Sequence, residues 1–177
     1  MKLTSAHYGH VNSISVVKSS SRSPSLVSVG DDGFARLWDP RVTRRQCSGI
    51  VNLHQRGSAC LWDPLDSRRF LVGTDEGSLL LFDTRKLGDA FESGGQDALI
   101  CSTSSVHSAR VRRLQPLAID YVDNRKIDSI STSNPTILSC ADDFTVSAVD
   151  IQKLVLAFGV DTIAIHKKSR CVYLVYY

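Results

Sequence analysis

The sequence lacks the patterns that would place it in a membrane or outside the cell. Its five cysteines are widely spaced and include no Cys-x-x-Cys pair, which argues against a zinc site or a disulfide framework. No apolar run approaches the roughly 20 residues that cross a bilayer. The opening stretch MKLTSAHYGH also lacks the apolar core of a secretory signal. We therefore expect a soluble protein of the cytoplasm and/or nucleus with reduced thiols.

Strong charge and clustered chemistry are also missing. The net charge of +3 is too small to indicate binding to nucleic acid or to an anionic membrane. The arginines at positions 110, 112 and 113 have no interleaved aromatic residues; we interpret them as solvated loop charge, with contact to RNA or an acidic peptide as the alternative. His7, His107 and His166 are scattered and form no metal-ligand set. We expect no metal, no cofactor and no catalytic residue.

The sequence does contain a repeat. The stretch Gly30–Arg41, GDDGFARLWDPR, places an Asp-Gly turn before an apolar run that ends in Trp38-Asp39. Asp-Gly between apolar runs predicts a β-hairpin, because glycine adopts positive φ without strain. The same features recur after a step of 44 positions, which aligns His10 with His54, Asp32 with Glu76, Gly33 with Gly77, Trp38 with Phe82, Asp39 with Asp83 and Arg41 with Arg85.

A Gly-His opening and a Trp-Asp closing, once per roughly 40–45 residues, mark the WD-repeat unit, which forms one four-stranded propeller blade. With Gly9-His10 and Trp38-Asp39, the chain resembles the WD-repeat β-propeller family. The resemblance implies an all-β fold. It divides the chain, residues 1–177, into blade one at about 9–51, blade two at about 53–95, an inserted loop at about 96–120, blade three at about 121–158 and a partial blade at 159–177.

Local patterns place the strands within these units. In blade one we expect strands at Ser13–Val17, Leu26–Gly30, Phe34–Asp39 and near Gln46–Val51; in blade two at Ser58–Leu61, Arg69–Thr74 and Ser78–Asp83; and in blade three near Ile127–Ser131, Thr136–Cys140, Thr145–Asp150 and Leu154–Phe158. Trp62-Asp63 follows Trp38-Asp39 too soon to close a blade, so Trp62 is expected to end the first strand of blade two. Phe144 stands where the other units have the turn glycine.

The number of blades also matters. Propellers close into rings of typically four to eight blades, which leaves only short, protected edges. Three blades and partial flanking strands leave two blade faces uncovered. We therefore expect an incomplete or fragmentary ring that is completed by missing blades, by self-association or by a partner.

The resemblance further implies a structural tetrad in which an indole, a hydroxyl, an imidazole and a carboxylate form a buried hydrogen-bonded chain. In blade one this tetrad would consist of His10, Ser28, Asp32 and Trp38. Blade two would keep His54, and blade three would have Tyr121 at the histidine position. Ser, His and Asp also serve in hydrolases, but catalysis needs an exposed nucleophile and an oxyanion site. The structural interpretation is the favoured one because the sequence contains no nucleophile elbow.

A second motif is an Asp-x-Arg after the third strand of consecutive blades. Its candidate partner-binding residues are Asp39, Arg41, Asp83 and Arg85. The motif resembles the WDxR box by which WD-repeat substrate receptors dock on the adaptor of cullin–RING ubiquitin ligases. An arginine fork of this kind recognises a carboxylate or carbonyl across an interface. The alternative is a local salt bridge with no docking role.

These observations favour a non-catalytic protein–protein interaction scaffold of the WD-repeat type. Fold alone does not dictate function, so two alternatives stay open. One is a substrate receptor of a cullin–RING ubiquitin ligase that binds the adaptor through the Asp-x-Arg motifs. The other is a propeller hydrolase. The expected partners are other proteins rather than nucleic acid or membranes.

Overall fold

The computed structural model describes residues 6–17, 25–39, 47–64, 66–87, 96–104, 106–117 and 136–151. These residues form an all-β structure of three antiparallel sheets. Sheet A contains β1 (Val11–Val16), β2 (Leu26–Gly30), β3 (Phe34–Trp38) and β4 (Gly49–Asn52). Sheet B contains β5 (Gly57–Trp62), β6 (Arg69–Thr74), β7 (Leu79–Asp83) and β8 (Leu99–Thr103). Sheet C contains β9 (Val111–Leu117), β10 (Thr136–Ala141) and β11 (Val146–Asp150).

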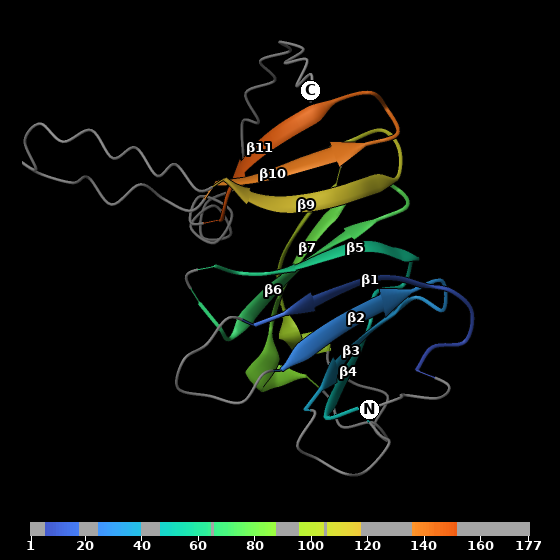
Figure 1. Ribbon diagram of the computed structural model, residues 1–177, viewed down its shortest axis with the longest axis vertical. Coiled ribbons are helices and arrows are strands. Elements are labelled where there is room, and N and C mark those ends of the chain that lie inside the picture. The colour runs from blue at the N-terminus through green and yellow to red at the C-terminus, as the bar shows by residue number, and fades with distance from the viewer. Residues whose placement is uncertain are drawn as a thin grey trace, which may run out of the picture.

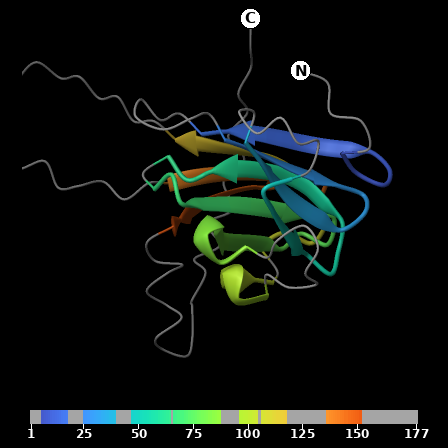
Figure 2. The same cartoon turned by 90° about the horizontal axis from the view of Figure 1, so that it is seen from below.

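In each sheet, strands that follow one another along the chain are neighbours. The orders are β1-β2-β3-β4, β5-β6-β7-β8 and, in the described part of sheet C, β9-β10-β11. Figure 1 shows sheet B between sheet A and sheet C, with β1, β5 and β9 lying next to one another. The view in Figure 2 places β1 and β9 along one side of the molecule and the short helices η1 (Thr84–Lys86) and η2 (Gln96–Ala98) along the opposite side. Among the described residues, no helix is long and apolar enough to cross a membrane.

Two apolar cores join the three sheets. Val27, Val29 and Val51 of sheet A pack with sheet B side chains that include Phe70 and Phe82. The rings of these two phenylalanines stack with centroids 5.3 Å apart, a geometry that adds to the burial of their area. The opposite face of sheet B packs on sheet C through a second cluster whose members include Leu71, Leu79, Leu81, Val111 and Ile137. Because sheet B is covered on both faces, β6 and β7 are nearly continuous apolar runs.

Hydrogen bonds also connect the first strands of sheets A and B. The hydroxyl oxygens of Ser13 and Ser15 accept the backbone N–H of Cys60 at 3.2 Å and that of Trp62 at 3.0 Å. The indole Nε1 of Trp62 donates to the backbone carbonyl of Ser15 at 3.0 Å. The first two bonds satisfy backbone N–H groups on the edge of β5 that does not pair within sheet B, and the third satisfies a carbonyl of β1. Trp62 is the last residue of β5, which confirms the prediction that Trp62 ends a first strand.

The hairpin turns of the three sheets share one backbone conformation. Gly33 and Gly77 have φ of 75° and 84°, and Phe144 has φ of 61° at the corresponding place. Glycine is required at position 77, because a Cβ there would meet the carbonyl oxygen of His107. Phe144 is 97% exposed, so its side chain meets no such obstacle. It retains the left-handed turn at the steric cost that a β-carbon brings.

The predicted inserted loop at 96–120 is wrong. This range contains β8, which pairs with β7, and β9, which pairs with β10. The last unit therefore begins at Val111 rather than near position 121, and its first two strands are separated by residues 118–135. The expected strands at Ile127–Ser131 and Leu154–Phe158 and the partial blade at 159–177 lie outside the described residues.

Candidate interaction surface

A buried hydrogen-bonded network connects the segment before β1 to sheet A. Trp38 Nε1 lies 2.8 Å from Ser28 Oγ, which lies 2.7 Å from His7 Nε2. The other ring nitrogen of His7, Nδ1, lies 2.8 Å from Asp32 Oδ1. An ionised carboxylate only accepts, so the Nδ1–H of His7 donates to Asp32 and Nε2 is left to accept. The hydroxyl of Ser28 then donates to His7 and accepts from the indole, so each of these four side chains has a hydrogen-bond partner within the network.

Asp32 is the most heavily bonded residue of this network. Besides His7, it accepts the backbone N–H of Tyr8 at 3.1 Å and Nη1 of Arg36 at 2.6 Å. Burial alone would raise the pKa of Asp32, but the hydrogen bonds from His7 and Arg36 outweigh burial and the pKa is lowered. Arg36 is itself buried, and its guanidinium lies 5.2 Å from the centre of the Phe34 ring. The carboxylate thus holds β3 and the segment before β1 together.

The assignment of His10 to the tetrad is wrong, because His7 occupies that place. The side chain of His10 is 89% exposed and pairs with Asp31 at 2.8 Å, whereas the side chain of His7 is fully buried. Ser28, Asp32 and Trp38 do lie together as expected. Once the strands are known, a common spacing identifies His7: it precedes the first residue of β1, Val11, by four positions, and His107 precedes the first residue of β9, Val111, by the same four.

Sheet C contains a related network. His107 Nε2 lies 2.7 Å from Ser139 Oγ, and His107 Nδ1 lies 3.2 Å from Asp143 Oδ2 and 2.8 Å from Thr145 Oγ1. The backbone N–H of Ser108 donates to Asp143 at 2.9 Å, as that of Tyr8 does to Asp32. Burial works to raise the pKa of Asp143, but hydrogen bonds from Thr145 and Ser108 prevail and lower it to about 2. His107 therefore takes the role that the sequence analysis gave to Tyr121, a residue outside the described ranges.

Sheet B has apolar residues at the same place. The first strand of each sheet begins with an equivalent pair: Val11 pairs with Gly30 in sheet A, and Gly57 pairs with Thr74 in sheet B. Position 53, four residues before Gly57, therefore corresponds to His7, four residues before Val11. Leu53 stands there, buried in the first core, which also contains Val72 and Phe82. His54, which the sequence analysis placed in this role, is exposed and has φ of 58°. An apolar cluster needs no hydrogen-bond partners and replaces the polar network without leaving a buried group unpaired.

The second Asp-x-Arg motif forms a local ion pair. Nη2 and Nε of Arg85 donate to the Asp83 carboxylate at 2.5 Å and 3.0 Å, and the backbone N–H of Arg85 donates to the same group at 3.0 Å. The hydrogen bond from the Arg85 side chain holds the pKa of Asp83 down to about 2. The Arg85 side chain is 61% exposed. In the first motif Asp39 is half-buried, and Arg41 lies outside the described residues.

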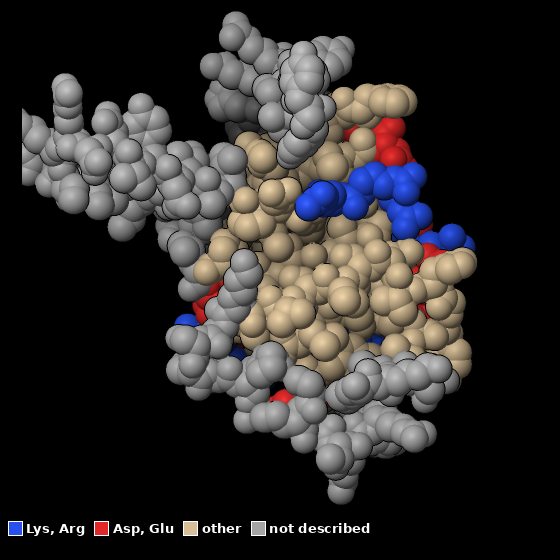
Figure 3. Space-filling view, in the orientation of Figure 1, with Lys and Arg blue, Asp and Glu red and all other residues tan. Residues whose placement is uncertain are grey.

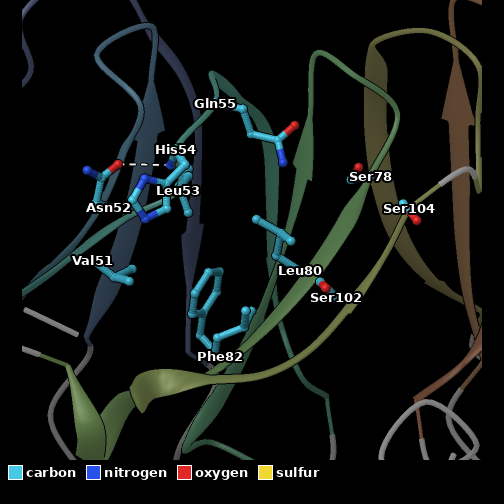
Figure 4. Close-up of a pocket in the computed structure, with 11 residues that line it drawn as sticks. Val51, Asn52, Leu53, His54, Gln55, Ser78, Leu80, Phe82, Ser102 and Ser104 are labelled. Atoms are coloured by element: carbon cyan, nitrogen blue, oxygen red, sulfur yellow. Dashed lines mark hydrogen bonds between the residues drawn. The ribbon is translucent and has the colours of Figure 1, made fainter. Parts of the chain in front are cut away.

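A pocket opens between sheets A and B, and we call it the A–B pocket (Figure 4). Its volume is about 250 Å³. The lining residues come from β4 and the connection after it, from β7 with the residue before it, and from β8 with the turn after it: Val51, Asn52, Leu53, His54, Gln55, Ser78, Leu80, Phe82, Leu99, Ser102 and Ser104. None of these side chains carries a permanent charge, and those at the mouth are amides, hydroxyls and one imidazole.

Basic side chains gather over β9 on the face shown in Figure 3. Arg112 and Arg113 of this strand are exposed, and Arg112 pairs with Asp142 at 2.6 Å. These arginines belong to a paired strand, not to the inserted loop that the sequence analysis predicted. Within the described ranges, no group of three or more His, Cys, Asp or Glu side chains is arranged to hold a metal ion.

Comparison with known proteins adds no family assignment. No protein-family model matches the chain, and a search of curated proteins finds no match.

Proposed function

We propose that the chain is a segment of a WD-repeat β-propeller and acts as a non-catalytic protein–protein interaction scaffold. The observation that carries the proposal is the recurrence of one buried network in two sheets of the stack, His7–Ser28 in sheet A and His107–Ser139 in sheet C. In both sheets the histidine precedes the first strand by the same number of residues and contacts the middle of the second strand.

The arrangement of the three sheets supports the same proposal. Each sheet packs face to face on the next, and the first strands lie together on one side. In a propeller the first strand of each blade lies nearest the central axis, and the turns at the two ends form the binding surfaces.

The burial of the two serines argues against the hydrolase alternative. Ser28 is 3% exposed and Ser139 is fully buried. A serine nucleophile has to be accessible to the substrate carbonyl, and hydrogen-bond donors that stabilise the oxyanion have to lie next to it. The Ser28 hydroxyl instead accepts a hydrogen bond from the Trp38 indole N–H and contacts His7. It therefore connects β2 to β3 and to the segment before β1.

Affinity capture with the full 177-residue chain tests the proposal, followed by reconstitution with each purified protein that is captured. A direct complex of defined stoichiometry is expected. Hydrolysis of p-nitrophenyl acetate by the wild type is the competing readout. A rate above the uncatalysed one that Ser28→Ala or Ser139→Ala abolishes, in variants shown to be folded, would overturn the scaffold proposal.

The ligase-receptor alternative rests on Arg85. Its guanidinium is exposed and is held in place by hydrogen bonds that Nε and Nη2 donate to Asp83. A guanidinium oriented in this way loses less rotamer freedom when it binds a carboxylate or carbonyl of an adaptor. The same geometry also suits a purely local salt bridge, so the adaptor experiment in the Discussion decides between the two.

A further inference from the structure

The A–B pocket has an apolar floor and a polar mouth. Val51, Leu53, Leu80 and Phe82 are buried residues of the first core, and Leu99 at the opening is 41% exposed. At the mouth lie the exposed side chains of Asn52, His54, Ser102 and Ser104. Such a combination suits an uncharged ligand that inserts an apolar group and forms hydrogen bonds at the rim.

One atom in the pocket lacks a hydrogen-bond partner. Among the buried side-chain nitrogen and oxygen atoms of the described residues, the Oε1 of Gln55 is the one with none. Figure 4 shows the Gln55 side chain extending from the connection after β4 toward sheet B, above Leu80. A buried acceptor that is left unpaired destabilises the fold until a donor reaches it. The oxygen itself is buried, so a donor on a molecule that enters the pocket would pair with it once the Gln55 amide turns toward the opening.

The size and position of the pocket narrow the class of ligand. Its volume of about 250 Å³ lies below the range of roughly 300–1,000 Å³ that is typical of drug-sized ligands and cofactors. It opens between β4 and β8, which are the outermost strands of sheets A and B. An outermost strand has one backbone edge that is not paired within its sheet, and extended peptides bind along such edges while alternate side chains enter adjacent pockets.

We propose that the A–B pocket binds an extended, uncharged peptide segment of a partner protein, with one apolar side chain on the floor and a backbone N–H donated to Gln55 Oε1. This inference deepens the scaffold function proposed above and rests on it. The lining carries no permanent charge, so an acidic or basic side chain in the same place would lose its hydration without compensation. The peptide is therefore expected to have an aliphatic residue at the inserted position.

The test is a titration of the full chain, followed by NMR, with the acetylated and amidated peptide Gly-Ser-Leu-Ser-Gly. Counterparts carry aspartate or lysine in place of leucine. Two further analogues replace, one at a time, the peptide N–H on either side of the leucine by an ester oxygen. The leucine peptide is expected to bind saturably, and the charged counterparts at least tenfold more weakly. One ester analogue should also lose about tenfold on the wild type.

Three variants make the result specific. Gln55→Met keeps the side-chain size but removes the carbonyl, so this variant should bind the leucine peptide and its ester analogue equally weakly. Its unfolding midpoint should rise, because the buried unpaired oxygen is gone. Ser102→Trp fills the mouth and should abolish binding. Ser67→Trp, at an exposed turn residue outside the lining, is the matched control and should bind as the wild type does.

Binding that is absent in the wild type, or unchanged in Gln55→Met and Ser102→Trp, overturns the peptide site. That failure is distinct from failure of the scaffold function. A partner captured equally by the wild type and by Ser102→Trp means that the scaffold stands and the pocket is not its binding site. If the wild type captures no partner, the scaffold proposal itself fails, and the peptide site fails with it.

Discussion

His7 hydrogen-bonds Ser28 with its Nε2 2.7 Å from the serine Oγ, and so attaches the segment before β1 to the middle of β2. The two residues are 21 positions apart, and neither belongs to a turn that could bring them together locally. His107 and Ser139 have the same 2.7 Å separation in sheet C. A histidine four positions before a first strand is thus the common element of the two networks, and it provides the first prediction.

Replacing His7 by alanine is expected to lower the free energy of unfolding by roughly 1–3 kcal/mol, because Ser28 and Asp32 lose a buried partner. His10→Ala is the matched control. His10 is exposed and pairs with Asp31 at the surface, so its loss should change the free energy by less than about 0.5 kcal/mol. Urea denaturation followed by tryptophan fluorescence measures both. Equal destabilisation by the two variants would contradict the assignment of His7.

Phe144→Gly is expected to stabilise the chain. The left-handed backbone at position 144 costs a residue with a β-carbon roughly 1–2 kcal/mol, and glycine removes this cost. Glycine also has greater freedom in the unfolded chain, which destabilises the folded state by about 0.5–1 kcal/mol and offsets part of the gain. The exposed ring gives up little packing, so the net gain should be near 0.5–1 kcal/mol.

Gly77→Ala is the opposite control for the turn. Its Cβ would collide with backbone atoms of His107 and Ala109, so the melting temperature should fall. If Phe144→Gly lowers the melting temperature as well, the ring has a packing role that its exposure does not reveal.

Stability should fall at acidic pH, partly through Asp143. The pKa of this carboxyl is lowered from 3.8 to about 2 in the folded chain. Between these values the unfolded chain binds the proton first, so stability is retained above pH 4 and lost as the pH falls toward 2. Denaturant midpoints at pH 7, 5, 4 and 3 measure the effect. Asp143→Asn should be less stable at pH 7 and should lose less on acidification.

The docking alternative predicts that Arg41→Ala and Arg85→Ala each weaken binding to a cullin–RING adaptor, by roughly tenfold or more if a buried charge of the adaptor is left unpaired. The effect of Arg85→Ala should be the smaller, because Phe82 replaces the tryptophan of the motif. A pull-down with purified adaptor measures this after melting curves show that all variants are folded. If the wild type does not retain the adaptor, the ligase hypothesis is wrong and the scaffold proposal is unaffected.

The sequence by itself determined the features that depend on neighbours along the chain. The Asp-Gly turn at Gly33 predicts a β2–β3 hairpin, because a short turn of this type joins adjacent strands whatever surrounds them. The apolar run before Asp83 likewise predicts β7. Trp62 is recognised as the end of a first strand because a complete hairpin still follows it. These local signals are enough for the all-β class and for most strands of sheets A and B.

Tertiary structure decided everything that depends on distant partners. Two adjacent arginines in Val111–Leu117 interrupt the alternation of apolar and polar residues that marks a strand. The segment becomes β9 only by pairing with β10, which lies beyond position 135. His7 and His10 have the same chemistry and lie on either side of Gly9. Which imidazole is buried depends on how the segment crosses sheet A, and that path is set by Ser28 and Asp32 more than 20 positions away. Local residue types carry no information about such a crossing, because the hydrogen bonds that fix it form only when the sheet has assembled.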